Sequence, residues 1–168
     1  MNLKQKLLGA AAVFVMLSVT DANAQADFLD VRAEVPEVCV ITSPINISLD
    51  FGLLDVLSAD STASATIDWR CSLGTIVTIA LGVGAGPSAN TTTRVMQGAN
   101  TGNPLPYRLL HPVTGGAWGN TGAELFTTTA LGLLSPESTL IDGIIALADA
   151  EVAAVDVYTD LVTITFLP

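Results

Sequence analysis

The feature that most constrains this chain is a strand pattern near its C-terminus that no further strand pattern follows. Residues 157–166 predict a core strand, because apolar side chains at Val162, Ile164 and Phe166 alternate with threonines. A final strand beside an empty position in its sheet would expose unpaired backbone groups and the core, which is an aggregation hazard. The sequence therefore predicts a sheet that is completed by an extended segment from another molecule.

A spare strand pattern lies near the other end of the chain, in residues 28–35. Charged side chains at Asp30, Arg32 and Glu34 separate apolar ones, which is the period of two of an amphipathic strand. The apolar positions are Phe28, Leu29, Val31, Ala33 and Val35. An ordinary first strand, paired within its own sheet, is the alternative interpretation. The missing strand after residue 166 favours a donor strand for a neighbouring molecule.

The first residues have the form of a secretion signal. Lys4 and Lys6 precede an apolar run over residues 7–19, and Ala22 and Ala24 form a small-x-small cleavage site. A transmembrane anchor is the alternative, but this run is too short to span roughly 30 Å of bilayer. We therefore expect a signal peptide over residues 1–24, a donor-strand extension over 25–37 and one folded domain over 38–168. We expect no membrane span in the mature chain.

The charge of the chain argues against one class of partner. The full sequence has 6 basic residues against 16 acidic ones, a formal net charge of -10 at pH 7. Both lysines fall within the predicted signal, so the remaining basic residues are all arginines: Arg32, Arg70, Arg94 and Arg108. Nucleic acid is not an expected partner, since no basic surface exists to neutralise phosphates. Solubility is the simplest explanation of the acidity.

The two cysteines, Cys39 and Cys71, predict one disulfide. An exported chain meets an oxidising compartment, in which an even pair of cysteines normally forms a bridge. A zinc site is the alternative, but two cysteines and the distant His111 fall short of the ligands that a structural zinc needs. His111 itself is predicted to lie on the surface, because it occupies a turn region and no nucleophile is identifiable around it. We expect neither a metal nor a cofactor.

Strand and turn patterns account for nearly all of the predicted domain. In residues 66–71, Ile67, Trp69 and Cys71 share one face of a half-buried strand. Clusters of glycine, proline, asparagine and threonine separate the strand patterns, which favours an all-β sandwich. Further strands are predicted over residues 39–42, 45–51, 75–81, 105–109 and 140–146. Residues 147–155 are rich in alanine and leucine but lack a capping signal, so we predict a loop or a distorted strand edge there.

An enzyme and a stand-alone binding module are the competing functional classes. A pair of carboxylates such as Glu124 and Glu137 could serve a glycosidase, but many acidic proteins contain such pairs by chance. No motif places a nucleophile beside a base, so we predict that the protein is not an enzyme. Trp69 and Trp118 are predicted to pack in the core or to anchor loops, although Trp118 could face solvent and stack on a sugar. A secreted carbohydrate-binding or adhesive β-sandwich module is therefore the alternative function.

Five short motifs follow one another through the predicted domain. They are Leu49-Asp50-Phe51-Gly52 after the early cysteine, Arg94-Val95-Met96, Leu105-Pro106-Tyr107-Arg108-Leu109, Ala117-Trp118-Gly119 and the run Val157-Tyr158-Thr159-Asp160-Leu161-Val162-Thr163-Ile164. In this order they resemble the spore coat protein U domain family, over nearly all of residues 26–168. That family includes the secreted pilins of archaic chaperone-usher systems in Gram-negative bacteria.

The resemblance implies an incomplete immunoglobulin-like Greek-key sandwich that lacks its last strand. A periplasmic chaperone would supply that strand, and the N-terminal extension of an identical or related pilin would replace it during export through an outer-membrane usher. By position, residues 28–35 would be the donor strand, and the acceptor groove would include Val157, Tyr158, Val162, Ile164 and Phe166. The protein would then be a structural subunit of a cell-surface pilus, secreted through the periplasm, that supports adhesion and biofilm formation.

Overall fold

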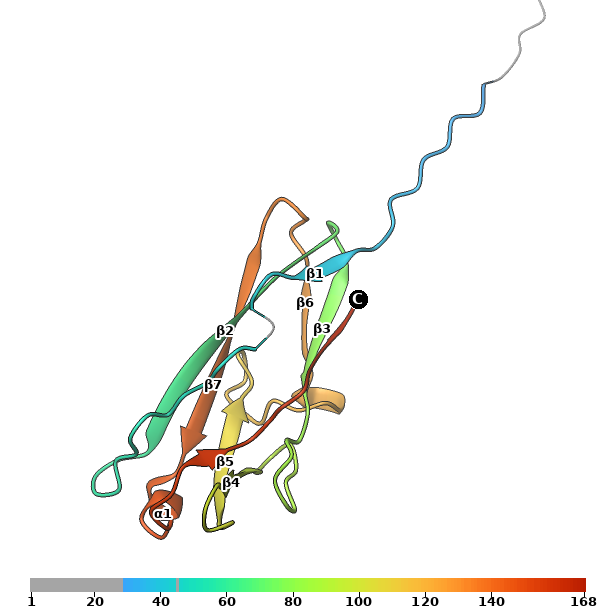
Figure 1. Cartoon of the computed structure of the whole chain (residues 1–168). Coiled ribbons are helices and arrows are strands. Elements are labelled where there is room, and N and C mark those ends of the chain that lie inside the picture. The colour runs from blue at the N-terminus through green and yellow to red at the C-terminus, as the bar shows by residue number, and fades with distance from the viewer. Residues whose placement is uncertain (1–28, 45) are drawn as a thin grey trace, which may run out of the picture. The chain divides into compact units, whose positions relative to one another are not determined.

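The computed structural model describes residues 29–44 and 46–168, and these fall into two units that divide after Glu34. Within residues 29–34, no strand is assigned, and Arg32 Nη2 lies 3.3 Å from Glu34 Oε2. The predicted signal peptide and Phe28 lie outside the described residues. The second unit, residues 35–168, is the folded body, and its regular secondary structure is almost wholly antiparallel strands (Figure 1).

The body consists of two sheets. The larger sheet contains, in spatial order, β1 (Cys39–Ile41), β2 (Ser61–Cys71), β7 (Glu137–Ile145), β5 (Pro104–Leu110), β4 (Arg94–Gly98) and β8 (Tyr158–Thr159). The smaller sheet contains β6 (Phe126–Thr129), β3 (Ile76–Leu81) and β9 (Ile164–Leu167), and the short helices are η1 (Gly122–Glu124) and α1 (Leu147–Ala150). Neighbouring strands are often distant in sequence, as in a Greek-key arrangement. The all-β, immunoglobulin-like sandwich that the sequence predicts is confirmed.

Strand β2 shows how the sequence positions the core. Its inward side chains alternate with small polar ones, and Ile67, Trp69 and Cys71 are buried as predicted. Trp69 Nε1 donates to Thr139 Oγ1 on the neighbouring strand at 2.9 Å, which satisfies the one polar atom of a buried indole. The strand begins at Ser61, five residues before the predicted start, because its first inward positions are small and give little apolar alternation.

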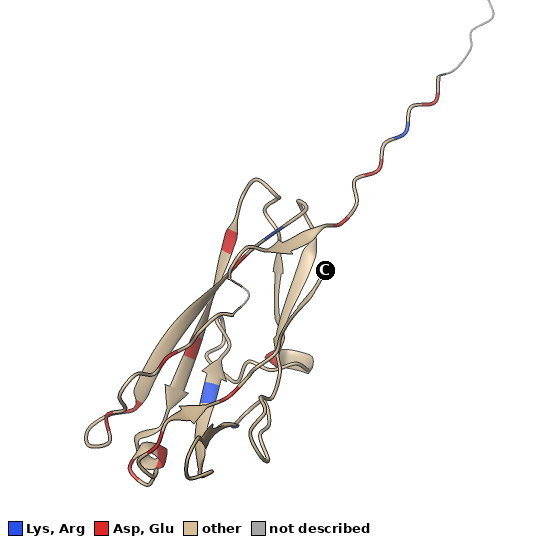
Figure 2. Cartoon of the chain, viewed as in Figure 1, with Lys and Arg blue, Asp and Glu red and all other residues tan. Residues whose placement is uncertain are grey.

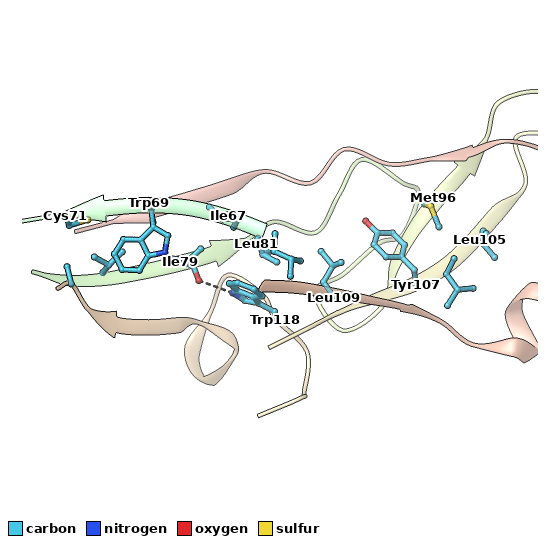
Figure 3. Packing of buried hydrophobic residues seen from close by; sticks show 14 of the residues in the cluster. Ile67, Trp69, Cys71, Ile79, Leu81, Met96, Leu105, Tyr107, Leu109 and Trp118 are labelled. Carbon is cyan, nitrogen blue, oxygen red and sulfur yellow. Dashed lines mark hydrogen bonds between the residues drawn. The ribbon is translucent and has the colours of Figure 1, made fainter. Parts of the chain in front are cut away.

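The core between the sheets is built around aromatic side chains (Figure 3). Trp118 is fully buried and its Nε1 donates to the Ile79 carbonyl at 3.0 Å, so it does not face solvent. The prediction that His111 lies on the surface is wrong, because only 7% of the residue is exposed. Its Nδ1 accepts the Val113 amide at 3.2 Å, and its ring stands edge-on to Phe126. The sequence predicts the turn, but not that its backbone folds over the imidazole.

The predicted disulfide joins Cys39 to Cys71. The two residues lie directly opposite each other in the β1–β2 ladder, with Cα atoms 4.1 Å apart. The bridge therefore ties the short first strand, only three residues long, to the longest strand of the larger sheet.

Residues 147–155 do not form the predicted loop throughout, because Leu147–Ala150 is one turn of helix. The Leu147 amide donates to Asp60 Oδ1 at 2.8 Å, a cap that comes from a residue 87 positions earlier. A helix start is predicted from a capping residue beside the helix in the sequence. Asp60 is remote in the sequence, so this helical turn was not predicted.

The charged residues are spread over the body. In Figure 2 the few basic positions are separated from one another, and acidic residues occur on several strands and loops. Among the described residues, no helix is both long and apolar enough to cross a membrane.

Candidate functional site

A long groove runs along the body between its first and last segments. One part has a volume of about 420 Å³ and the adjoining part about 600 Å³. Both parts are lined by Ile47, Ser48, Leu161, Val162 and Ile164, so the two form one continuous depression. Each part has the volume of a typical ligand site and is large enough to hold several side chains.

The floor of the groove is the hydrophobic core itself. It is formed by Ala65 and Ile67 of β2, Leu81 of β3, Met96 of β4, Tyr107 and Leu109 of β5, and Ile141 of β7. Figure 3 shows Leu81, Leu109, Tyr107 and Met96 in a row along the core. These floor side chains are at most 9% exposed, so most of the apolar surface that the groove offers comes from the partly buried side chains of its walls. Such a surface favours an apolar segment that covers it.

One wall is formed by residues 46–51. Ile47, Leu49 and Phe51 turn inward while the residues between them are exposed, which is the alternation predicted for a strand. The prediction of a strand over residues 45–51 is nevertheless wrong for 46–51, because no described residue pairs with this segment through the backbone. Leu49 and Phe51 pack over Gly143, where a Cβ atom would lie 2.8 Å from Phe51 Cζ.

The opposite wall is the last segment of the chain. Residues 157–166 are not one core strand as predicted, because β8 pairs with β4 of the larger sheet and β9 pairs with β3 of the smaller one. Residues 160–163 cross between the two sheets, and of their backbone groups only the Thr163 carbonyl accepts a described backbone donor, Gly82 N at 2.8 Å. Each wall thus contains a stretch of backbone that is largely unpaired among the described residues.

The five residues predicted for an acceptor groove all line this groove, and its occupation by a donor strand stays a prediction. Val157, Tyr158, Val162 and Ile164 line the smaller part, and Phe166 lines the larger one. Val157 contributes from the rim, because its side chain is mostly exposed. The sequence interpretation missed the floor and the wall at residues 46–51. The alternation of Ile47, Leu49 and Phe51 was the signal that could have identified that wall.

Asp160 holds the last segment in position at the smaller part of the groove. Its carboxylate accepts the Tyr107 hydroxyl at 2.7 Å and the Ala85 amide at 2.6 Å. Burial raises the pKa of Tyr107, and the hydrogen bond to Asp160 raises it further, so the phenol stays a donor. Gly84 makes room for this contact, because a Cβ there would lie 2.1 Å from Asp160 Oδ2.

Asp156 fixes the start of the same wall. Its carboxylate accepts hydrogen bonds from the Thr101 hydroxyl at 2.7 Å, the Thr101 amide at 2.6 Å and Asn100 Nδ2 at 2.8 Å. The bonds from Thr101 are the main cause that holds the pKa of Asp156 well below its usual value. The turn between β4 and β5 is thereby tied to the residue that precedes β8.

Arg94 is buried rather than a surface charge. Its guanidinium donates to four main-chain carbonyls, those of Leu81, Gly82, Thr91 and Trp118, at 2.7–3.1 Å. Burial lowers the pKa of Arg94, and the negative charges of Asp160 and Glu124 oppose that shift. The side chain links the end of β3, next to the groove, to two loops.

The residues predicted for the donor strand are not brought to any site within the described chain. Leu29, Val31, Ala33 and Val35 are exposed and belong to no assigned strand. Val31, at the centre of the set, is 79% exposed.

The family model of the Spore Coat Protein U domain matches residues 25–165. The chain belongs to this family. It is also similar in fold to a chain of a crystal structure from Acinetobacter baumannii. That structure is the CsuC–CsuE chaperone–tip adhesion subunit pre-assembly complex of archaic chaperone-usher Csu pili. The two chains share 19% sequence identity, and the TM-score is 0.53. The similarity covers 79% of this spore coat U domain chain but only 40% of that chain. No curated protein matches the sequence.

Proposed function

We propose that this spore coat U domain protein is a structural subunit of a cell-surface pilus assembled through a chaperone-usher pathway. Residues 28–35 of one copy act as the donor strand and fill the groove of the next copy. The observation that carries the proposal is the apolar groove between residues 46–51, which pair with no described backbone, and residues 160–163, which pair only through the Thr163 carbonyl. The neighbour in fold, which is a chaperone–subunit complex of such pili, supports the same pathway.

The length and pattern of the extension support the assignment. Residues 159–166 span about 26 Å as extended chain and residues 29–35 about 23 Å, at roughly 3.3 Å per residue. Four apolar side chains on one face of the extension would meet a floor made of apolar side chains. The charged residues between them would stay in solvent. Pro36 follows, and since proline cannot donate to a ladder, it marks the end of the inserted strand.

The energetics favour a durable joint. Each large aliphatic side chain that becomes fully buried contributes about 1.5–3 kcal/mol. Hydrogen bonds to the free backbone of the walls add about 0.5–1.5 kcal/mol each. Ordering the backbone of the extension costs about 1–2 kcal/mol per residue, which offsets a large part of this gain. The stability of a fibre then rests on slow dissociation, since unzipping exposes the whole groove together.

The same proposal assigns the partners and the location. A periplasmic chaperone would cover the groove before assembly, an outer-membrane usher would export the subunit, and the pilus would support adhesion and biofilm formation. No catalytic role belongs to the proposal. The described part of the chain holds no group of three or more His, Cys, Asp or Glu residues that could bind a metal ion.

Trypsin tests the donor assignment directly, because Arg32 lies in the middle of the extension. Val31→Asp should leave secretion of the monomer possible but block fibre growth, since it places a charge where an apolar pocket receives valine. We expect trypsin to cut at Arg32 in this variant and to spare Arg32 in wild-type fibres, where the strand would be covered. Glu34→Gln, on the opposite face of the extension, is the matched control and should form normal fibres. Normal fibres from Val31→Asp would refute the assignment.

A further inference from the structure

Four exposed leucines lie on two neighbouring loops of the body. We call Leu73, Leu131, Leu133 and Leu134 the leucine pad; Leu73 is 80% exposed and Leu134 98%. The loop between β2 and β3 carries Leu73, and the loop between β6 and β7 carries the other three. Figure 1 shows both loops at the same end of the body.

The two loops are held together by the backbone. Gly74 N donates to the Ala130 carbonyl at 3.0 Å, and Ala130 N donates to the Thr75 carbonyl at 2.9 Å. A Cβ atom on Gly132 would lie 3.6 Å from the Cβ of Leu73, so the second loop passes directly beside this leucine. These contacts fix the backbone of both loops while their leucines stay exposed. An exposed apolar surface on a fixed backbone is typical of an interaction site.

The N-terminal extension leaves the body beside the pad. Ser72 Oγ donates to the Pro36 carbonyl at 3.0 Å and accepts the Val38 amide at 3.1 Å. Ser72 N donates to the Val38 carbonyl at 2.9 Å. Pro36 is thus anchored to the residue that precedes Leu73. Almost no free linker separates the body from Val35, the last apolar residue of the proposed donor strand.

This short connection determines what must lie against the pad. Consecutive Cα atoms are about 3.8 Å apart, and the hydrogen bond from Ser72 to Pro36 joins the two segments, so a Val35 inserted in a neighbour's groove keeps that groove within roughly 15 Å of Leu73. We propose that the leucine pad packs on a second copy of this chain, at the mouth of the groove that receives its extension. The inference rests on the proposed function and adds to it a contact between the two bodies beside the donated strand.

Two measurements separate the pad from the groove. The first is uptake of a synthetic peptide of residues 25–37 by the chain that carries Val31→Asp, with and without Leu73→Ser and Leu134→Ser. A peptide has no body, so the pad substitutions should leave its affinity unchanged. The second is the dissociation rate of fibres in denaturant. Fibres with both pad substitutions should dissociate at least about tenfold faster than wild-type fibres, a difference of about 1.4 kcal/mol.

Val113→Ser is the matched control, because Val113 is exposed on a different loop and lines neither part of the groove. Fibres of this control should dissociate at the wild-type rate. Pad-variant fibres that dissociate as slowly as wild-type fibres, while the peptide still binds, would overturn the pad and leave the groove intact. A peptide that does not bind would instead overturn the proposed function. Equal acceleration by Val113→Ser would show a general effect of lost apolar surface and also overturn the pad.

Discussion

Asp160 should stabilise the groove wall mainly through one hydrogen bond. Replacing it with alanine leaves the Tyr107 hydroxyl, which belongs to a buried residue, without its acceptor at 2.7 Å. A hydrogen bond to a charged group contributes about 1.5–3 kcal/mol, and an orphaned buried donor costs about 1–3 kcal/mol. The Ala85 amide also loses its acceptor, but Ala85 is exposed and water can replace it. We therefore expect Asp160→Ala to lower the free energy of unfolding by about 2 kcal/mol.

Urea unfolding measures this loss, with the buried Trp69 and Trp118 as fluorescent reporters. The Val31→Asp background keeps the chain monomeric during the measurement. A double-mutant cycle with Tyr107→Phe should give a coupling of at least about 1 kcal/mol, since the two groups share the hydrogen bond. Glu151→Ala, at an exposed acidic residue, should change little. A loss below about 0.5 kcal/mol for Asp160→Ala, with no coupling to Tyr107, would refute the reasoning.

Three further perturbations have expected outcomes. Replacing Cys39 and Cys71 with serine opens a loop with a sequence separation of 32, so urea unfolding should show a loss of about 3–4 kcal/mol; a negligible loss would contradict the chain-entropy argument. The pKa of Asp156 is lowered in the folded chain, so its contribution is present above the ordinary value of 3.8 and is lost as the pH falls below it. Asp156→Asn should therefore flatten the acid limb of a stability–pH curve, and an unchanged limb would count against the lowered pKa. In Gly86→Ala the new Cβ would lie 1.8 Å from the Val95 carbonyl oxygen, so thermal melting should report a loss of about 1–3 kcal/mol, and an unchanged melting temperature would rule out the close approach.

Local sequence patterns determined much of this fold, because buried and exposed side chains alternate along a strand and the alternation is visible in the sequence. The inward face of residues 66–71, the β3 and β5 strands and the pairing of Cys39 with Cys71 all follow from alternation and cysteine count. The five groove residues of the last segment came from the family resemblance, and their role as an acceptor groove stays a prediction. The strand faces and the disulfide depend on residues that are close together in the sequence, so they can be predicted from the sequence alone.

Tertiary contacts decided the rest. The alternation in residues 46–51 shows which side chains face inward, but whether the backbone finds a partner depends on segments far away. The helical turn at residues 147–150 depends on a cap from Asp60, and the burial of His111 depends on a turn that folds over it. The last segment divides between two sheets because β3 and β4 offer separate edges to it. Sequence alone therefore determined several strands and their inward faces, among them those of β2, β3 and β5. Only the folded body showed that residues 46–51 and most of residues 160–163 pair with no described backbone beside the groove, because strand pairing is a contact between residues that are remote along the chain.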